Sequence, residues 1–252
     1  MKFFQFETLG STNIEADRRF ELATTPPFWV RADAQSAGRG RRGRDWASPK
    51  GNFYGTACYT FDGSPQDAAK FSFVAAIAVA KALNAYTLTA EPSLKWPNDV
   101  LIDGRKIAGL LLETKPGRIL IGIGVNLVSH PEGGNIPATH LLEHIDPAVL
   151  DTDEPEFTGP EGFLAVLSDA LDRAIRKHLA CGFSATRSDW SDLAKGLPGH
   201  VTVRLPNETF MGDATGLLEN GALRVVQENG TIRDVHAGDV FFWDRLNVAR
   251  DR

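Results

Sequence analysis

The chain has 252 residues, of which 42% are hydrophobic, and a formal net charge of −5 at pH 7. A chain of this size buries enough apolar surface to fold without disulfides or a metal, and its two cysteines, Cys58 and Cys181, lie too far apart in sequence to suggest a zinc or redox pair. The acidic balance argues against a protein whose main partner is nucleic acid, and the longest apolar-rich run, residues 71–85, is too short to span a membrane, so we expect a soluble cytoplasmic protein.

The first predicted elements are strands at residues 3–9 and 28–33 with a helix between them. Thr12 and Glu15 fit the Ser/Thr-x-x-Glu capping box, which predicts that the helix starts there and continues to the break at Pro26-Pro27. Aromatic and small residues at strand spacing predict a further strand at residues 52–61.

A basic, glycine-rich loop, GRGRRGR at residues 38–44, precedes that strand. Its glycines allow the backbone to fold closely over a ligand and to offer N–H donors, and its arginines can make paired hydrogen bonds to carboxylate or phosphate. The pattern fits a site that brings two anions together. Taken alone, it favours a solvated basic loop or an RNA-binding segment over catalysis, because short arginine-rich loops are common.

The middle of the chain predicts a helix, then a hairpin, then a central strand. Pro65 begins the helix, which continues to about Ala85. Strands are predicted at residues 100–102 and 105–113, on either side of an Asp-Gly turn. The run ILIGIGVNL at residues 119–127 is apolar on both faces, as in a central strand covered on both sides.

A lysine near this hairpin is a candidate catalytic residue, and an aspartate lies close to it in the sequence. Lys106, just past the turn, is placed to project into a cleft on the face of the sheet and to neutralise a transferring group. Asp99 closes the block KWPND at residues 95–99. The alternatives are an exposed surface lysine and an aspartate that only caps a turn.

The composition changes twice in the second half of the chain, after residue 128 and again at residue 200. Residues 129–160 are rich in proline, glycine and acid, which indicates irregular surface. Two helices are predicted at residues 163–180 and 183–195, separated by Gly182. From residue 200 onward, short strands alternate with asparagine-containing turns, so we expect a first domain at residues 1–197 and a small β-barrel domain at residues 198–252.

One motif in the irregular segment would imply a different function, zinc-dependent hydrolysis. His140, Glu143 and His144 fit the His-x-x-Glu-His pattern of certain zinc proteases, in which two histidines one helical turn apart bind the metal. Asp146-Pro147 would end any helix at once, so we interpret the motif as a chance cluster. The remaining histidines show no ligand spacing; they are His130, His178, His200 and His236.

Four motifs in order carry a resemblance to the biotin protein ligases. These motifs are Ser11-Thr12-Asn13 with Gln35; GRGRRGR followed by Trp46-Ala47-Ser48-Pro49; KWPNDVLIDGRKIAG at residues 95–109; and Gly122 to Leu127, GIGVNL. The resemblance covers nearly the whole chain, including the AGDV ending at residues 237–240. One mild departure is Phe53, where the family commonly has leucine.

The resemblance implies a role for each matching residue. The biotin-binding residues would be Ser11, Thr12, Asn13, Gln35, Arg39, Gly40, Arg41, Lys106 and Gly109. Arg44, Trp46 and Asn126 would lie near ATP. Lys106 and Arg41 would act in catalysis, and Asp99 would orient or deprotonate the acceptor lysine.

The resemblance also implies an α+β fold, a class II synthetase-like mixed, mostly antiparallel sheet with helices, followed by an SH3-like barrel. The expected activity is ATP-dependent formation of biotinyl-5′-AMP with Mg²⁺, then transfer to a lysine of a biotin carboxyl carrier protein. Residues 3–9 lead directly to Ser11 and leave no room for a winged-helix domain, so we expect no DNA binding. A lipoate or octanoate ligase is the nearest alternative, a nucleic-acid-binding module is the alternative of another class, and oligomeric state is open.

Overall fold

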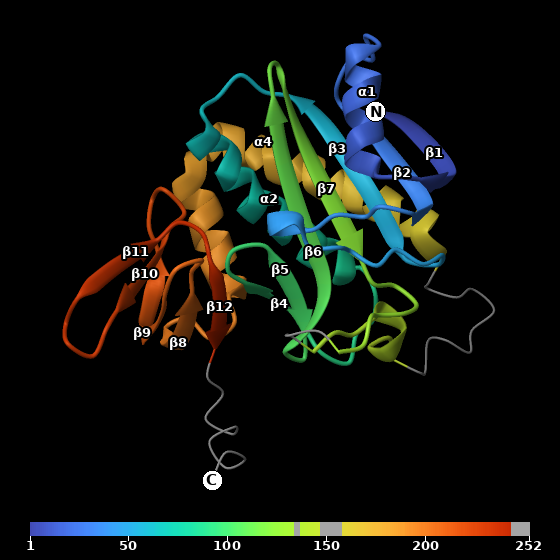
Figure 1. Ribbon diagram of the computed structural model, residues 1–252. Helices are drawn as coiled ribbons and strands as arrows, with labels where there is room; N and C mark the ends of the chain where they lie inside the picture. The colour runs from blue at the N-terminus through green and yellow to red at the C-terminus, as the bar shows by residue number, and fades with distance from the viewer. Residues whose placement is uncertain (134–136, 147–157, 243–252) are drawn as a thin grey trace.

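The computed structural model describes residues 1–133, 137–146 and 158–242. A seven-stranded sheet has the strand order β1-β2-β3-β7-β6-β5-β4, and a second, five-stranded sheet lies beside it (Figure 1). The strands of the first sheet are β1 Lys2–Leu9, β2 Phe28–Gln35, β3 Phe53–Thr60, β4 Pro92–Lys95, β5 Asp99–Ile102, β6 Arg105–Lys115 and β7 Arg118–Val125. The helices are α1 Thr12–Glu21, α2 Pro65–Leu83 and α4 Gly159–Leu193, with short 3-10 turns η1 Arg41–Gly43 and η2 Leu141–Glu143.

The large sheet is mixed, as expected, because β1 and β2 pair in parallel and every other neighbour is antiparallel. The predicted hairpin joins β5 to β6 through Asp103 and Gly104, which both have positive φ, as an Asp-Gly hairpin turn requires. The predicted central strand, β7, lies fourth of seven. These local predictions are confirmed.

Alternation along the strands divides the core between the two faces of the sheet. On β2, Trp29 packs in the main core with α2 and α4, while Phe28 and Val30 pack in a smaller cluster that includes Ala16 of α1. The same division holds on β7, where Ile119 and Ile121 face the main core and Leu120 faces α1. The face that carries α1 is therefore covered only in part and leaves room for a site.

The start of α1 differs from the prediction. Ser11 is the N-cap residue and its side chain makes no capping hydrogen bond, while Thr12 is the first helical residue. Glu15 pairs with Arg18 and Arg19 one turn later instead of reaching back to the cap. The capping-box interpretation is wrong because the Thr12 hydroxyl bonds to Gln35 of β2 instead.

The segment expected to be irregular surface is partly core. Leu141 and Thr139 have no exposed surface, and Ile145 is 2% exposed. Leu141 joins the main core, and backbone bonds attach η2 to the chain just after β7. Residues 134–136 and 147–157 of this segment lie outside the described residues. The prediction is wrong for Thr139, Leu141, His144 and Ile145, because tertiary contacts, not local composition, bury them.

The predicted break at Gly182 is present. Its φ of 74° and ψ of 178° interrupt α4, so that two helices meet at a kink. Both stretches pack near α2, since Phe71 contacts His178 before the kink and Phe73 contacts Phe183 and Trp190 after it, all edge to face. The two-helix prediction for residues 163–195 is confirmed.

The C-terminal strands form a small antiparallel sheet in the order β11-β10-β9-β8-β12. They are β8 Gly199–Arg204, β9 Thr209–Leu217, β10 Leu223–Val226, β11 Ile232–Val235 and β12 Asp239–Phe242. Val201 and Val225 of this sheet belong to the same core cluster as α2 and α4. Of the helices described, none combines the length and apolar character needed to cross a membrane.

Candidate active site

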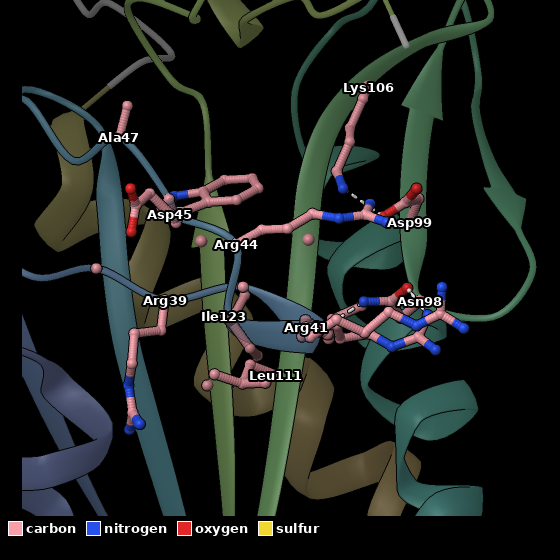
Figure 2. A pocket seen from close by; sticks show the side chains of 18 of the residues that line it. Arg39, Arg41, Arg44, Asp45, Ala47, Asn98, Asp99, Lys106, Leu111 and Ile123 are labelled. Carbon is pink, nitrogen blue, oxygen red and sulfur yellow. Dashed lines mark hydrogen bonds and ion pairs between the residues drawn. The ribbon is translucent and has the colours of Figure 1, made fainter. Parts of the chain in front are cut away.

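A cavity of about 860 Å³ opens on the α1 face of the large sheet. Its wall contains every residue that the sequence analysis singled out as catalytic or binding: Ser11, Thr12, Asn13, Gln35, Arg39, Gly40, Arg41, Arg44, Trp46, Asp99, Lys106, Gly109 and Asn126. Figure 2 shows that the arginines of the loop and Lys106 reach this space from different elements. These predicted residues, up to 115 positions apart in the chain, thus meet in one pocket.

Glycines on β6 and β7 make the floor of the cavity. Gly109 and Gly124 lie opposite each other in the β6–β7 register, and a Cβ at Gly124 would meet the Trp46 indole nitrogen at 2.6 Å. A Cβ at Gly109 would meet the same ring at 2.9 Å. A side chain at Gly122 would collide with Asn13. The missing side chains therefore create the space that Trp46 and Asn13 occupy.

A polar network lines one end of the cavity. The amide oxygen of Gln35 accepts a hydrogen bond from the Thr12 backbone N–H at 2.8 Å. The Thr56 hydroxyl donates to the Asn13 amide oxygen at 2.6 Å, and the Asn13 amide nitrogen donates to Glu113 at 2.6 Å. Thr12, Asn13 and Thr56 are all buried, so these bonds fix their orientations.

The arginine loop folds as a short hairpin over the cavity. Arg39 and Asp45 form a β-bridge, and the Gly40 N–H donates to the Arg44 carbonyl at 2.7 Å. Arg42 between them has a φ of 57°, in the left-handed region. Arg41 donates to the Asn98 side chain at 3.0 Å (Figure 2). Burial lowers the pKa of Arg41, and the Asp99 carboxylate opposes the shift.

Lys106 enters the cavity because of a β-bulge. The register between β5 and β6 shifts between Val100 and Leu101, which leaves Ile107 as an extra residue on β6. Ile107 is fully buried in the main core, and Lys106 turns to the opposite face. Its ammonium lies 2.5 Å from a carboxylate oxygen of Asp99 and 5.5 Å from the Trp46 ring centre.

Asn126 lies at the end of β7 with its side chain inside the protein. It is 2% exposed, and its amide nitrogen donates to the Thr139 carbonyl at 3.0 Å. The Asn126 N–H donates to the Ile107 carbonyl at 2.8 Å. This residue therefore holds the bulge of β6, the end of β7 and the segment at residue 139 together.

Comparisons with known proteins agree with this geometry. Residues 6–128 match the model of the Biotin/lipoate A/B protein ligase family, and residues 200–243 match that of the Biotin protein ligase C terminal domain. A biotin--[acetyl-CoA-carboxylase] ligase of Paracoccus denitrificans is 36% identical over 238 residues, which cover 92% of this chain and 97% of that protein. The chain belongs to the biotin protein ligase family.

Other members of the biotin protein ligase family are similar over different shares of their length. The bifunctional ligase/repressor BirA of Bacillus subtilis is 27% identical over 217 residues, 84% of this chain and 65% of that protein. A structure described as biotin protein ligase from Aquifex aeolicus in complex with biotin and ATP superposes with a TM-score of 0.77 at 25% identity, covering 96% of this chain and 98% of that chain.

Four further residues of this family member line or support the cavity and were not among the predicted site residues. Lys95 and Asn98 lay within the KWPND block and Asp239 within AGDV, so the motifs held a signal for them. Glu113, which binds Asn13 and Arg39, carried none. Its role depends on β6 lying beside β7 and below α1, which no local pattern reveals.

Two of these residues have shifted pKa values. Burial lowers the pKa of Lys95, which lies 5.4 Å from the Phe241 ring centre, although the Asp99 carboxylate opposes the shift. Burial acts to raise the pKa of Asp239, but the hydrogen bond and charge of Arg44 outweigh it, so the pKa lies below its ordinary value. The C-terminal sheet thus contributes a carboxylate to the arginine loop.

Proposed function

We propose that this chain activates biotin with ATP to form biotinyl-5′-AMP and then transfers biotin to a lysine of a biotin carboxyl carrier protein. The observation that carries the proposal is the single cavity in which the polar network, the arginine loop and Lys106 meet. Membership of the family and the similarity to a structure with biotin and ATP support it.

In the first step, a biotin carboxylate oxygen attacks the α-phosphorus of ATP, an acyl–phosphate bond forms, and pyrophosphate leaves. Two anions must approach, so fixed positive charge in a partly enclosed site lowers the barrier. Lys106 and Arg41 are the cations that we assign to the carboxylate and the α-phosphate. Lys95, buried in the same wall, adds a third positive group.

We assign the biotin ring to the end of the cavity lined by Ser11, Thr12, Asn13 and Gln35. Their hydroxyl and amide groups match a ureido ring, which both donates and accepts hydrogen bonds. Gly109 leaves room beside Lys106 and Trp46, where the biotin carboxylate would lie. Arg39 and Gly40 would close over the bound acid from the loop.

We assign the nucleotide to the other side of Lys106, near Trp46, Arg44 and Asn126. The Trp46 indole offers an apolar face for adenine, and its N–H is buried with no partner among the described residues. Asn126 acts as a positioning residue, since its side chain already bonds to Thr139.

Mg²⁺ is part of the proposal and would be held chiefly through the ATP phosphates. Two carboxylates of the cavity wall are already paired with cations, Asp99 with Lys106 and Asp239 with Arg44. Because both carboxylates already have a partner, the ATP phosphates would supply most of the ligands of Mg²⁺. When bound, Mg²⁺ neutralises phosphate charge.

In the second step, the carrier lysine amine attacks the acyl carbonyl, and AMP leaves with the electron pair of the broken bond. The amine must first lose a proton, because its ordinary pKa is near 10.4. We assign that proton to Asp99. The Asp99–Lys106 contact of 2.5 Å suggests an exchange, in which the bound phosphate takes over Lys106 and frees the carboxylate.

Biotin-dependent exchange of labelled pyrophosphate into ATP tests the proposal. We expect exchange with biotin and none with lipoate, and a carrier domain should gain the mass of one biotinyl group. Exchange with lipoate but not with biotin would assign the chain to the other branch of its family. The expected cytoplasmic location, the absence of DNA binding and the boundary at residue 198 stay predictions.

A further inference from the structure

The structure separates the two histidines of the His140-x-x-Glu143-His144 motif. His140 and His144 do not share one helical face, because residues 141–143 form only a 3-10 turn. His144 is buried and its Nε2 lies 2.8 Å from the Thr139 hydroxyl and 3.3 Å from Arg105. The protease-like pairing of these two histidines is therefore wrong for this chain.

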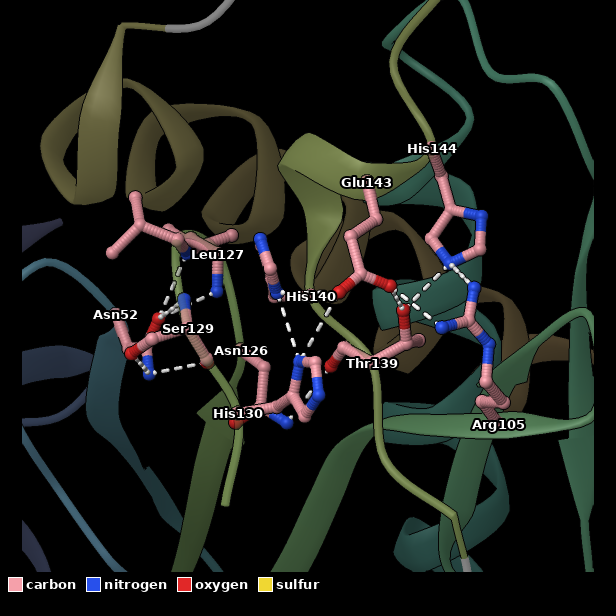
Figure 3. Close-up of polar contacts among 11 residues, drawn as sticks. Asn52, Arg105, Asn126, Leu127, Ser129, His130, Thr139, His140, Glu143 and His144 are labelled. Atoms are coloured by element: carbon pink, nitrogen blue, oxygen red, sulfur yellow. Dashed lines mark hydrogen bonds and ion pairs between the residues drawn. The ribbon is translucent and has the colours of Figure 1, made fainter. Parts of the chain in front are cut away.

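His130, and not His144, lies beside His140. His130, ten residues earlier, brings its Nδ1 to 2.8 Å from the Nδ1 of His140 (Figure 3). The nearer carboxylate oxygen of Glu143, Oε1, lies 3.3 Å from the His140 nitrogen and 3.6 Å from the His130 nitrogen. Three ligand atoms thus converge on one point, within 4.8 Å of one another.

The other carboxylate oxygen of Glu143 is already held. Oε2 accepts hydrogen bonds from Arg105 at 2.6 Å and from the Thr139 hydroxyl at 2.8 Å. This arrangement leaves Oε1 directed at the two imidazoles. Hydrogen bonds that orient a ligating carboxylate in this way are typical of metal sites.

The backbone on both sides of the cluster is fixed. Asn52 accepts from the N–H groups of residues 127, 128 and 129, which fixes the chain just before His130. Before His140, the Lys106 N–H donates to the Pro137 carbonyl and the Thr139 N–H donates to the Lys106 carbonyl. Ligands on rigid supports lose little entropy when they bind an ion.

We propose that His130, His140 and Glu143 bind one divalent transition-metal ion of the zinc class. Two imidazole nitrogens and one carboxylate oxygen suit zinc, whereas magnesium and calcium prefer oxygen alone. Tetrahedral bonds of about 2.0–2.1 Å place ligand atoms about 3.3 Å apart, so the two nitrogens need to separate by about half an ångström from 2.8 Å. Two unprotonated nitrogens at the observed distance repel unless a cation or a proton lies between them.

The ion would act as a structural clamp beside the cavity. It would join the two ends of the segment 130–140, in which Pro131 and Ala138 line the cavity wall. Ala138 also forms a β-bridge with Lys106. The clamp would therefore stabilise the strand position of Lys106 without touching the reacting groups.

Titration of the metal-free, untagged protein with Co²⁺, in the absence of nucleotide, tests this site. We expect one equivalent to bind with visible absorption typical of nitrogen ligation, and Zn²⁺ to displace it. His130→Ala and Glu143→Gln should each weaken binding by at least about tenfold. His200→Ala is the matched control, because His200 also pairs with a carboxylate, that of Asp213, but in the C-terminal sheet.

Circular dichroism of each variant shows whether the fold is retained. A folded wild-type protein that gives no cobalt spectrum overturns the proposal. Binding that survives in folded His130→Ala at wild-type affinity also overturns it, because the ion would then lie elsewhere. Loss of binding in His130→Ala and Glu143→Gln, with retention in His200→Ala, supports it. None of these readouts depends on ligase activity.

Discussion

Lys106 combines two features that make it a sensitive test of the proposed chemistry. The bulge at Ile107 directs it into the cavity, and its partner there is the carboxylate of Asp99. Its side chain is a quarter exposed and contributes little to the main core. Removal of its charge should therefore affect catalysis far more than folding.

For Lys106→Ala we expect the single-turnover rate of adenylate formation to fall by about 10²–10³, equivalent to about 3–4 kcal/mol. The thermal midpoint should change little. Lys115→Ala on the same strand is the control, because Lys115 pairs with Asp17 outside the cavity. Equal rates for wild type and Lys106→Ala would make Lys106 a bystander.

Arg41 is the loop residue that we expect to retain the finished adenylate. Arg41→Gly should still form biotinyl-5′-AMP but release it, because the guanidinium no longer links the loop to the bound anion. The free mixed anhydride acylates accessible amines, so serum albumin incubated with the variant, biotin and ATP should become detectable with streptavidin.

Arg42→Gly is the matched control for that experiment. Glycine suits the φ of 57° at this position, and Arg42 faces Asp239 instead of Asn98. Its albumin labelling should stay close to that of wild type. If Arg41→Gly forms adenylate yet labels albumin no more than wild type does, Arg41 has no retention role.

Strands β6 and β7 shape the cavity because their glycines have no side chains. Gly109 and Gly124 face each other across the pair, and the Trp46 ring occupies the space above them. Because β7 is central, its backbone cannot shift to accommodate a new side chain without disturbing β3 and β6. A methyl group there must move the indole instead.

Gly124→Ala should accordingly raise the KM for ATP by about tenfold or more, equivalent to about 1.4 kcal/mol, with a smaller effect on biotin. Steady-state pyrophosphate exchange at varied ATP and biotin concentrations measures both constants. Gly10→Ala is the control, since a Cβ there meets no atom within 4 Å. An unchanged KM for ATP would argue against adenine lying beside Trp46.

For the whole molecule, one core cluster includes residues of both sheets and of α2 and α4. Trp96 links them, because its indole N–H donates to the Gly221 carbonyl at 3.1 Å and both groups are buried. We therefore expect the described parts of the chain to unfold in one cooperative transition.

Trp96→Phe leaves the Gly221 carbonyl unpaired and should reduce the free energy of unfolding by about 1–3 kcal/mol beyond the packing loss. Trp29→Phe is the control that breaks no hydrogen bond, because the Trp29 indole nitrogen is buried with no partner among the described residues. Urea unfolding of both variants gives the difference. Two separate transitions would instead show that residues 198–252 form an independently folding domain.

Local patterns in the sequence were sufficient for most strands of the large sheet, the hairpin turn at Asp103-Gly104 and the helix break at Gly182, because each depends on neighbouring residues. Ordered motifs were also sufficient for the family, and the residues that they name line one cavity.

Only the tertiary structure decided which of those residues contact each other. Asn13 and Glu113 bond across 100 positions, and His130 meets His140 because β7 and η2 are packed together. Thr12 bonds to Gln35 instead of capping its helix for the same reason. Strand order and register set these contacts, and both follow from how the whole core packs, which no short stretch of sequence contains.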